Sequence, residues 1–264
     1  MQTGLVALFC KMQRRKLVFR VAHDTDCIPG KELIRFERDR KIYRYGLRNA
    51  DLVVAQSEQQ KELLRKNYGI DAPVINMAVE LPESDPDERD IDVLWVNNIR
   101  EFKRPDRLVE FARNNRDLRI VMIGGPCDGS ESLYERVMAE SSQLDNLEFK
   151  GFVPYHEVNA YYRRAKVFVN TSVTEGFPNS FLQSWIRGTP VVSFFDPDGV
   201  IEREELGASP CDLADMGDKV RELINDAEKY ALLSSNAKSF AQKHYSAMSV
   251  ACDYITHFSR KGLR

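Results

Sequence analysis

The sequence predicts an α/β protein whose larger part is a doubly wound parallel sheet. From Ile91 onward, short apolar runs alternate with amphipathic helical segments, which is typical of parallel strands covered by helices. The first eighty residues show a shorter version of the same alternation, as half of an open α/β domain would. Between these parts, residues 80–90 are rich in acid and proline, which indicates an interdomain linker or, alternatively, a long surface loop within one domain.

We therefore expect a partial amino-terminal Rossmann-like domain over 1–82, a linker over 83–90, a second domain over 91–245 and a last helix over 246–264. In the second domain the apolar runs predict five strands: Ile91–Val96, Leu118–Ile123, Leu147–Phe149, Val167–Val169 and Val191–Phe195. Seven helices are expected there and beyond: Arg107–Asn114, Glu131–Ser142, Tyr155–Arg164, Ser180–Arg187, Gly217–Asp226, Lys229–Lys243 and Ala247–Arg260.

In the first domain the expected strands are Leu17–Ala22, Leu52–Ala55 and Pro73–Asn76, and the expected helices are Gly4–Met12, Lys31–Leu47 and Glu58–Asn67. Ser57 has the position and side chain of a helix N-cap. We expect both tryptophans, Trp95 and Trp185, to lie in the core.

Composition narrows the class of protein. With 43% hydrophobic residues and a formal net charge of -2, the chain is typical of a protein with a real core, and nucleic acid is disfavoured as its main partner. The five cysteines are scattered without metal-ligand spacing, which favours reduced thiols in the cytoplasm. The apolar patch from Leu5 to Phe9 is too short to span a bilayer.

The stretch from Val167 to Gly188 has the most chemical content. The predicted strand ends in small polar residues, Gly176 and Pro178 mark a loop, and Asn179 or Ser180 has the character of a helix cap. Such a unit directs backbone N–H groups toward the carboxyl edge of a parallel sheet, where phosphates bind. From spacing alone, an ordinary strand-to-helix turn remains an equal alternative.

The residues themselves carry a resemblance. Glu175-Gly176-Phe177-Pro178-Asn179-Ser180, followed by Gln183 eight positions after the glutamate and by Gly188–Val192, resembles the donor-site motif of retaining glycosyltransferases of family 4. That family has the GT-B fold. One departure is that Gln183 stands where the family has a second glutamate.

The resemblance implies transfer of a sugar from a UDP-, GDP- or ADP-linked donor to an acceptor hydroxyl with retention at the anomeric carbon. The acceptor would be a sugar, a lipid-linked sugar or a polysaccharide under biosynthesis, and neither a cofactor nor an essential metal is expected. The last helix would cross back to the first domain. The basic residues near Leu5–Phe9 favour either peripheral contact with an anionic membrane or a helix left exposed by truncation.

The same resemblance implies roles for individual residues. Lys103, in the loop before Pro105, is expected to hold the leaving phosphates, because negative charge develops there as the glycosidic bond breaks. Asn98 occupies the family's arginine position, with Arg100 nearby. Glu175 would bind sugar hydroxyls, and the backbone from Phe177 to Ser180 would meet the phosphates.

Four further residues are candidates for ligand contact. Gln183 would reach the nucleotide ribose, or else be a surface amide; an amide still donates and accepts hydrogen bonds. Gly124 resembles part of the family's glycine-rich turn. Phe152 follows the predicted strand at whose end, in the family, the backbone contacts the nucleobase. Both positions also suit ordinary turns. His23 resembles an acceptor-side histidine, with a structural role as the equal alternative.

Against the family pattern, we expect the first domain to begin in its middle, so that the sequence is either a fragment or a truncated gene product. The main alternative function is a non-catalytic protein that binds a sugar nucleotide. A GT-B epimerase is a third possibility, but no clear set of cleft carboxylates supports it.

Overall fold

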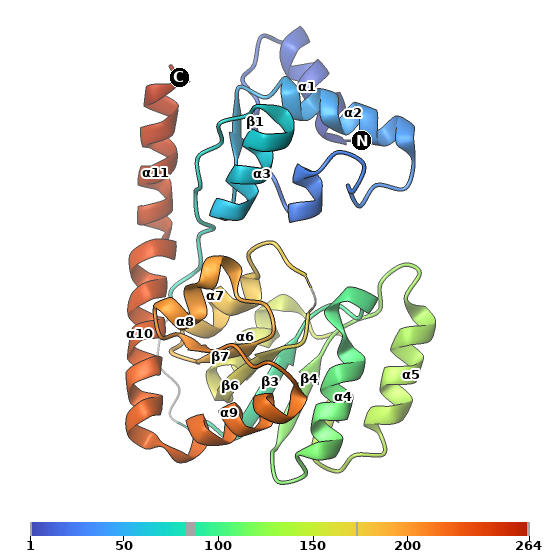
Figure 1. Cartoon of the computed structure of the whole chain (residues 1–264), viewed down its shortest axis with the longest axis vertical. Helices are drawn as coiled ribbons and strands as arrows, with labels where there is room; N and C mark the ends of the chain where they lie inside the picture. Colours follow the sequence, from blue (N-terminus) through green and yellow to red (C-terminus); the bar gives the residue numbers. More distant parts are fainter. Residues whose placement is uncertain (1, 83–87, 173, 263–264) are drawn as a thin grey trace. The chain divides into compact units, whose positions relative to one another are not determined.

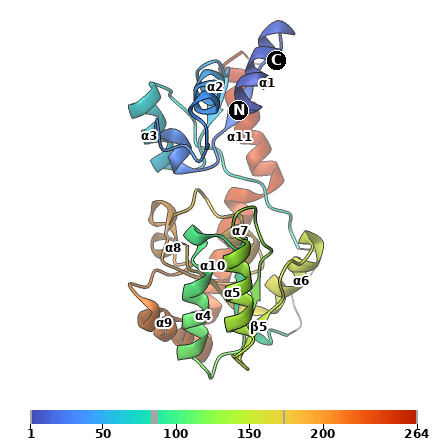
Figure 2. The ribbon, with the colours of Figure 1, turned by 90° about the vertical axis from the view of Figure 1, so that its right-hand side faces the viewer.

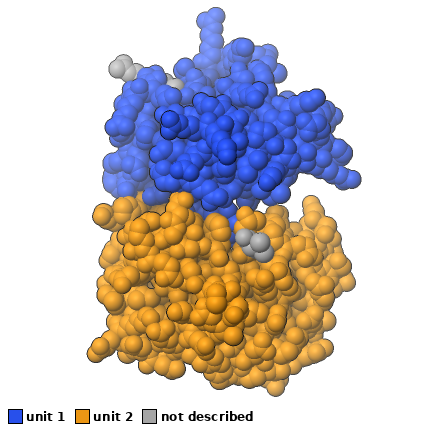
Figure 3. All heavy atoms as spheres, viewed as in Figure 1, with its two compact units in different colours: residues 1–78, 175–177, 247–264 blue, residues 79–174, 178–246 orange. Residues whose placement is uncertain are grey.

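The computed structural model describes residues 2–82, 88–172 and 174–262 and divides the chain into two compact units (Figure 3). Unit 1 comprises Met1–Ala78, Glu175–Phe177 and Ala247–Arg264, and unit 2 comprises Val79–Thr174 and Pro178–Ser246. Most of the predicted linker, at 83–87, lies outside the described residues. Both units contain parallel strands flanked by helices, so the predicted α/β class is confirmed.

Unit 2 is built on a six-stranded, all-parallel sheet with strand order β5-β4-β3-β6-β7-β8 (Figure 1). The strands are β3 (Ile91–Val96), β4 (Ile120–Ile123), β5 (Leu147–Phe149), β6 (Ala165–Asn170), β7 (Val191–Ser193) and β8 (Gly207–Ala208). The central strands are apolar on both faces, as expected where helices cover both sides of a parallel sheet.

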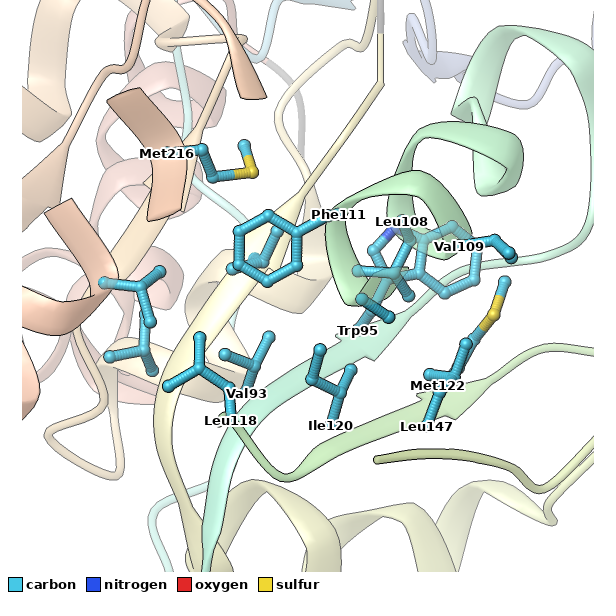
Figure 4. Packing of buried hydrophobic residues seen from close by; sticks show 14 of the residues in the cluster. Val93, Trp95, Leu108, Val109, Phe111, Leu118, Ile120, Met122, Leu147 and Met216 are labelled. Atoms are coloured by element: carbon cyan, nitrogen blue, oxygen red, sulfur yellow. The ribbon is translucent and has the colours of Figure 1, made fainter. Parts of the chain in front are cut away.

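One face of this sheet carries α4 (Pro105–Asn114), α5 (Glu131–Ser141) and α9 (Leu213–Asn225). Figure 4 shows Trp95 and Ile120 of the sheet packing near Phe111 and Leu108 of α4. Figure 2 shows α4 and α5 side by side. The side chains of Trp95, Ile120, Phe111 and Leu108 are fully buried, and each contributes about 1.5–3 kcal/mol of hydrophobic stabilisation.

The other face carries α6 (Tyr155–Arg164), α7 (Asn179–Trp185) and α10 (Ala227–Tyr245). A run of aromatic contacts joins strand and helices: Phe168 of β6 meets Phe181, whose ring centroid lies 5.5 Å from that of Trp185. Trp185 in turn lies 5.8 Å from Phe240 of α10. Both tryptophans are fully buried, as predicted.

Unit 1 has a two-stranded parallel sheet of β1 (Val18–Arg20) and β2 (Leu52–Val54). Its helices are α1 (Gln2–Met12), α2 (Glu37–Arg48), α3 (Glu58–Tyr68) and α11 (Ala247–Arg260), with a short 3-10 turn η1 (Asp24–Cys27) after β1. The Ser57 hydroxyl accepts the Gln60 N–H, so its prediction as a cap is confirmed. On α11, Val250 packs with Leu52 of β2.

Two predicted elements of the first domain were wrong in extent. The helix expected from Lys31 begins only at Glu37, because the Glu32 carboxylate turns inward, accepting the Gly30 N–H at 2.7 Å and pairing with Arg44 at 2.6 Å. The strand expected at Pro73–Asn76 is a single bridge between Ala55 and Val74.

Differences in unit 2 are smaller. Strand β7 ends at Ser193, whose hydroxyl accepts the Phe195 N–H and so competes with the ladder. Short elements missed by the sequence are η2 (Glu101–Lys103), η3 (Pro197–Gly199), α8 (Val200–Arg203) and β8. Helix α7 ends at Trp185 rather than Arg187. Its N-cap is Pro178 without a side-chain cap bond, so the capping prediction for Asn179 or Ser180 was wrong.

Candidate functional site

The two central strands of unit 2 end in asparagines at the carboxyl edge of the sheet. Asn97 follows β3 and Asn170 ends β6, and the helices that follow these strands, α4 and α7, cover opposite faces. Ligands of open α/β sheets bind in the crevice outside such a switch point. Among the described residues, neither asparagine side-chain nitrogen has a hydrogen-bond partner, although both are buried. This edge of the sheet therefore carries two buried amide nitrogens, one at the end of each central strand.

Backbone hydrogen bonds hold together the loops that follow β3, β4 and β5. The Asn97 N–H donates to the Ile123 carbonyl at 3.1 Å, and the Gly124 N–H donates to the Gly151 carbonyl at 2.9 Å. A Cβ atom on Gly124 would lie 2.2 Å from the Asn97 carbonyl oxygen. Close backbone approach thus requires glycine at position 124.

Lys103 lies at the end of η2, directly before α4. The Thr171 hydroxyl, just beyond β6, lies 2.9 Å from the backbone carbonyl oxygens of both Lys103 and Arg104 and accepts the Trp95 indole N–H at 3.0 Å. This bond network fixes the lysine loop against the end of β6. The sequence marks Thr171 as a small polar residue after a strand, but its partners are visible only in the structure.

The other predicted residues of this edge are more exposed. Asn98 and Arg100 are exposed in the same loop as Lys103, and Phe152, after β5, is 73% exposed. A Cβ atom on Gly125 would lie 3.2 Å from the Phe152 Cβ, so the two loops are in contact there. Lys103 Nζ lies 5.1 Å from the ring centroid of Phe102, in cation–π range.

Helix α7 begins at the same carboxyl edge of the sheet, after β6. Pro178 is buried, Asn179 is exposed and Ser180 is half-buried at its first turn. Gln183 does not stand free at this edge: its amide nitrogen donates to the Tyr155 hydroxyl at 3.0 Å, and its amide oxygen accepts from Arg187 at 2.7 Å. Burial lowers the pKa of the Arg187 guanidinium from its ordinary value.

The remaining predicted residues belong to unit 1. His23 caps η1 after β1 and is half-buried. Gly176 lies against Ala22, the residue before His23: a Cβ atom on Gly176 would be 2.3 Å from the Ala22 carbonyl oxygen. Glu175 is buried, with 5% of its surface exposed, and Phe177 is half-buried. The structure thus brings His23 and Gly176 to one end of β1, and Lys103, Gly124, Phe152 and Gln183 to the carboxyl edge of unit 2.

Within the part of the chain that the structure describes, no three His, Cys, Asp or Glu side chains gather closely enough to hold a metal ion. Likewise, none of the described helices has the length and apolar character needed to cross a bilayer. The five cysteines are free thiols.

Comparison with known proteins identifies the family. A family model described as "Glycosyl transferases group 1" matches residues 78–240, which is more than half of the chain. The chain belongs to this family. The match spans the carboxyl edge described above, from the β3 loop to α7.

Individual relatives of this group 1 glycosyltransferase are distant. A D-inositol 3-phosphate glycosyltransferase of Mycobacterium sp. (strain JLS) is 25% identical over 170 residues, covering 62% of this chain and 39% of that protein. An uncharacterized glycosyltransferase, MJ1178, of Methanocaldococcus jannaschii is 26% identical over 231 residues, covering 84% of this chain and 62% of that protein. The chain therefore spans less than two thirds of the length of these relatives.

Solved structures show the fold. The crystal structure of Anabaena Alr3699/HepE in complex with UDP and glucose matches 97% of this chain and 75% of its own, with a TM-score of 0.80 at 17% identity. Sucrose-phosphate synthase (tll1590) from Thermosynechococcus elongatus covers 97% of this chain and 71% of its own, with a TM-score of 0.77 at 20% identity. The expectation of a GT-B-like fold is confirmed.

Proposed function

We propose that this chain binds a nucleoside-diphosphate sugar at the carboxyl edge of unit 2 and takes part in transferring the sugar to an acceptor hydroxyl. The observation that carries the proposal is the carboxyl edge of β3 and β6, where Asn97 and Asn170 stand at the two strand ends and Thr171 holds the backbone of the Lys103 loop. A diphosphate needs donors and a cation held in place, and this edge offers both. Family membership supports the same function.

The roles follow from the geometry and the sequence motif together. Lys103 holds the diphosphate, helped by Arg100, Asn98 and the amides of Asn97 and Asn170. The backbone of Phe177–Ser180 adds N–H groups. Gln183 lies at the ribose end.

The nucleobase lies near Phe152, beside the loop that contains Gly124. Glu175 binds hydroxyls of the transferred sugar, and His23 contacts that sugar or orients the acceptor. These roles are proposals, and the proposed transfer is of the retaining, family 4 type.

Donor and acceptor are proposed at the level of class. The donor is linked to UDP, GDP or ADP, and UDP is the first choice because the solved relative named above binds it. The acceptor is a sugar, a lipid-linked sugar or a growing polysaccharide. Peripheral contact with an anionic membrane, through the basic turn at 11–16, belongs to the same proposal, as does a cytoplasmic location.

Binding is tested by isothermal titration calorimetry of the full chain with UDP, GDP and ADP. One of these is expected to bind, and Lys103→Ala is expected to weaken it about 10- to 100-fold, because a hydrogen bond to a charged group contributes about 1.5–3 kcal/mol. Lys219→Ala, which removes a half-buried lysine of α9, is the matched control and should leave the affinity unchanged. No binding of any of the three at millimolar concentration would overturn the proposal.

A second measurement separates transfer from binding alone. With the matching nucleotide sugar and simple sugar acceptors, release of the nucleoside diphosphate indicates transfer, and the anomeric coupling of the product in proton NMR reports retention. Binding without release would favour the alternative of a non-catalytic sugar-nucleotide-binding protein.

A further inference from the structure

A chain of polar contacts joins the first two turns of α6 to Gln183 on α7 and to Arg187 just beyond its end. Tyr155 begins α6, and its hydroxyl accepts from the amide nitrogen of Gln183 at 3.0 Å. The amide oxygen of Gln183 accepts from Arg187 Nη1 at 2.7 Å, and Arg187 Nη2 donates to Asn159 Oδ1 at 3.0 Å. Asn159 lies one turn after Tyr155 on α6, so the contacts return to the helix on which they began and form a ring.

The buried guanidinium determines which way the amide points. Arg187 is 6% exposed, and a guanidinium can only donate hydrogen bonds. The oxygen of the Gln183 amide must therefore face Arg187, and its nitrogen must face Tyr155. Arg187 also donates to the Gln183 backbone carbonyl at 2.9 Å, which ties side chain and main chain of one residue to a single group.

This orientation has a consequence for the tyrosine. Because the amide nitrogen donates to the Tyr155 oxygen, the hydroxyl proton of Tyr155 is directed elsewhere. Among the described residues no acceptor for that proton is present within hydrogen-bond distance, and Tyr155 is 66% exposed. The Tyr155 hydroxyl, contacted by an amide whose direction the buried Arg187 sets, presents a neutral donor to solvent, with the exposed Phe152 three residues away in sequence.

The chemistry of this corner selects a class of ligand group. Tyr155 has one free donor and one lone pair, and Gln183 has one further amide N–H. Neighbouring neutral donors and acceptors match the hydroxyls of a sugar ring, each of which both donates and accepts. They do not match a phosphate, because the one cation of the ring, Arg187, is sealed from solvent.

We propose that Tyr155 is a specificity-determining residue of the nucleotide site, whose hydroxyl, positioned by Gln183, contacts a ribose hydroxyl of the bound nucleoside diphosphate. The inference rests on the proposed function, and it moves the main ribose contact from Gln183, whose oxygen is turned inward, to Tyr155. Arg187 is a positioning residue, because it orients the amide without touching the ligand.

The test measures affinity by calorimetry for the ribonucleoside diphosphate that the chain binds best and for its 2′-deoxy and 3′-deoxy forms. The wild-type chain is expected to prefer the ribonucleotide over one deoxy form by roughly two- to tenfold, as one hydrogen bond allows. Tyr155→Phe is expected to weaken binding of the ribonucleotide by the same factor and to leave the affinity for that deoxy form unchanged. The variant would therefore lose the preference for the ribonucleotide.

Tyr161→Phe is the matched control, since it removes a hydroxyl from the same helix outside the ring and should keep the preference. Equal affinity of wild type and Tyr155→Phe for the ribonucleotide would overturn this inference while leaving the proposed function intact. Equal weakening of ribo and deoxy ligands would also overturn it. If the wild type binds no nucleotide, both proposals fall together.

Discussion

Unit 1 and unit 2 cover their parallel strands to different extents. In unit 2, six strands carry helices on both faces, and Trp95, Phe111 and Phe168 are fully buried. In unit 1, two strands carry fewer helices, and α1 leaves Leu5, Phe9 and Met12 between 53% and 71% exposed. A two-stranded sheet buries little by itself. We therefore expect unit 1 to open at a lower free energy than unit 2, whose buried core is better suited to hold a ligand in place.

The largest expected effect tests whether the two cores are independent. Phe111→Ala should lower the free energy of unfolding of unit 2 by about 3–5 kcal/mol, because it leaves a cavity in a closely packed core. The cluster that contains Phe111 consists of residues of unit 2, and the cluster that contains Tyr43 and Leu64 consists of residues of unit 1, so hydrogen exchange in α2 and α3 should stay as in the wild type. Hydrogen-exchange mass spectrometry measures both.

Leu232→Ala is the control, since Leu232 is 52% exposed on α10 and its loss should change stability by less than about 0.5 kcal/mol. If Phe111→Ala accelerates exchange in α2 and α3 as much as in α4, the cores are coupled and the comparison fails.

A middle-sized effect concerns the buried ion pair of unit 1. Glu32 is fully buried at its side chain, and although burial alone raises its pKa, the hydrogen bond from Arg44 brings the pKa below its ordinary value. Glu32→Gln should destabilise unit 1 by about 1.5–3 kcal/mol, since it removes a charge-assisted bond. Chemical denaturation followed by exchange in α2 measures this loss.

The pH dependence of the same pair has a definite sign. A carboxylate with a lowered pKa contributes stability that is present above the ordinary glutamate value of about 4.3 and is lost as the pH falls through the lowered value. Wild-type unit 1 should therefore lose stability on acidification below about pH 4, while Glu32→Gln should lack this component. Parallel acid profiles of the two proteins would contradict the role given to Glu32.

The smallest effect is expected at an ion pair of unit 2, between Asp90 and Arg164. The Arg164 guanidinium, 2.7 Å from the Asp90 carboxylate, lowers the pKa of Asp90 to about 2. Both side chains are partly exposed, so Asp90→Asn should cost about 1 kcal/mol or less.

The stability that the Asp90 pair contributes is present above the ordinary aspartate pKa of about 3.9 and is lost as the pH falls toward 2. Acid titration of the melting temperature measures it, with Asp117→Asn, at an exposed pair with Arg221, as the comparison. A loss above about 3 kcal/mol would show that unit 2 depends on its surface pairs more than on its core.

Local patterns in the sequence were enough for much of the fold. Runs such as Val167–Val169 must be strands buried on two faces, because their continuous apolar character suits helices on both sides of a sheet. The Ser57 cap and the buried positions of Trp95 and Trp185 are of the same kind, since each depends on neighbouring residues or on hydrophobicity alone. The motif at 175–192 identified the edge of the sheet where a site is expected.

Tertiary structure decided what depends on contacts between distant residues. The inward turn of Glu32 toward Arg44 delays the start of a helix that periodicity alone would begin at Lys31, because a buried carboxylate must find a cation. Asn97 and Asn170 stand at the ends of adjacent strands only because β3 and β6 are neighbours in the sheet. The Gln183 amide oxygen accepts from Arg187, a guanidinium that is itself buried against Asn159 of α6, and no local pattern reports that burial.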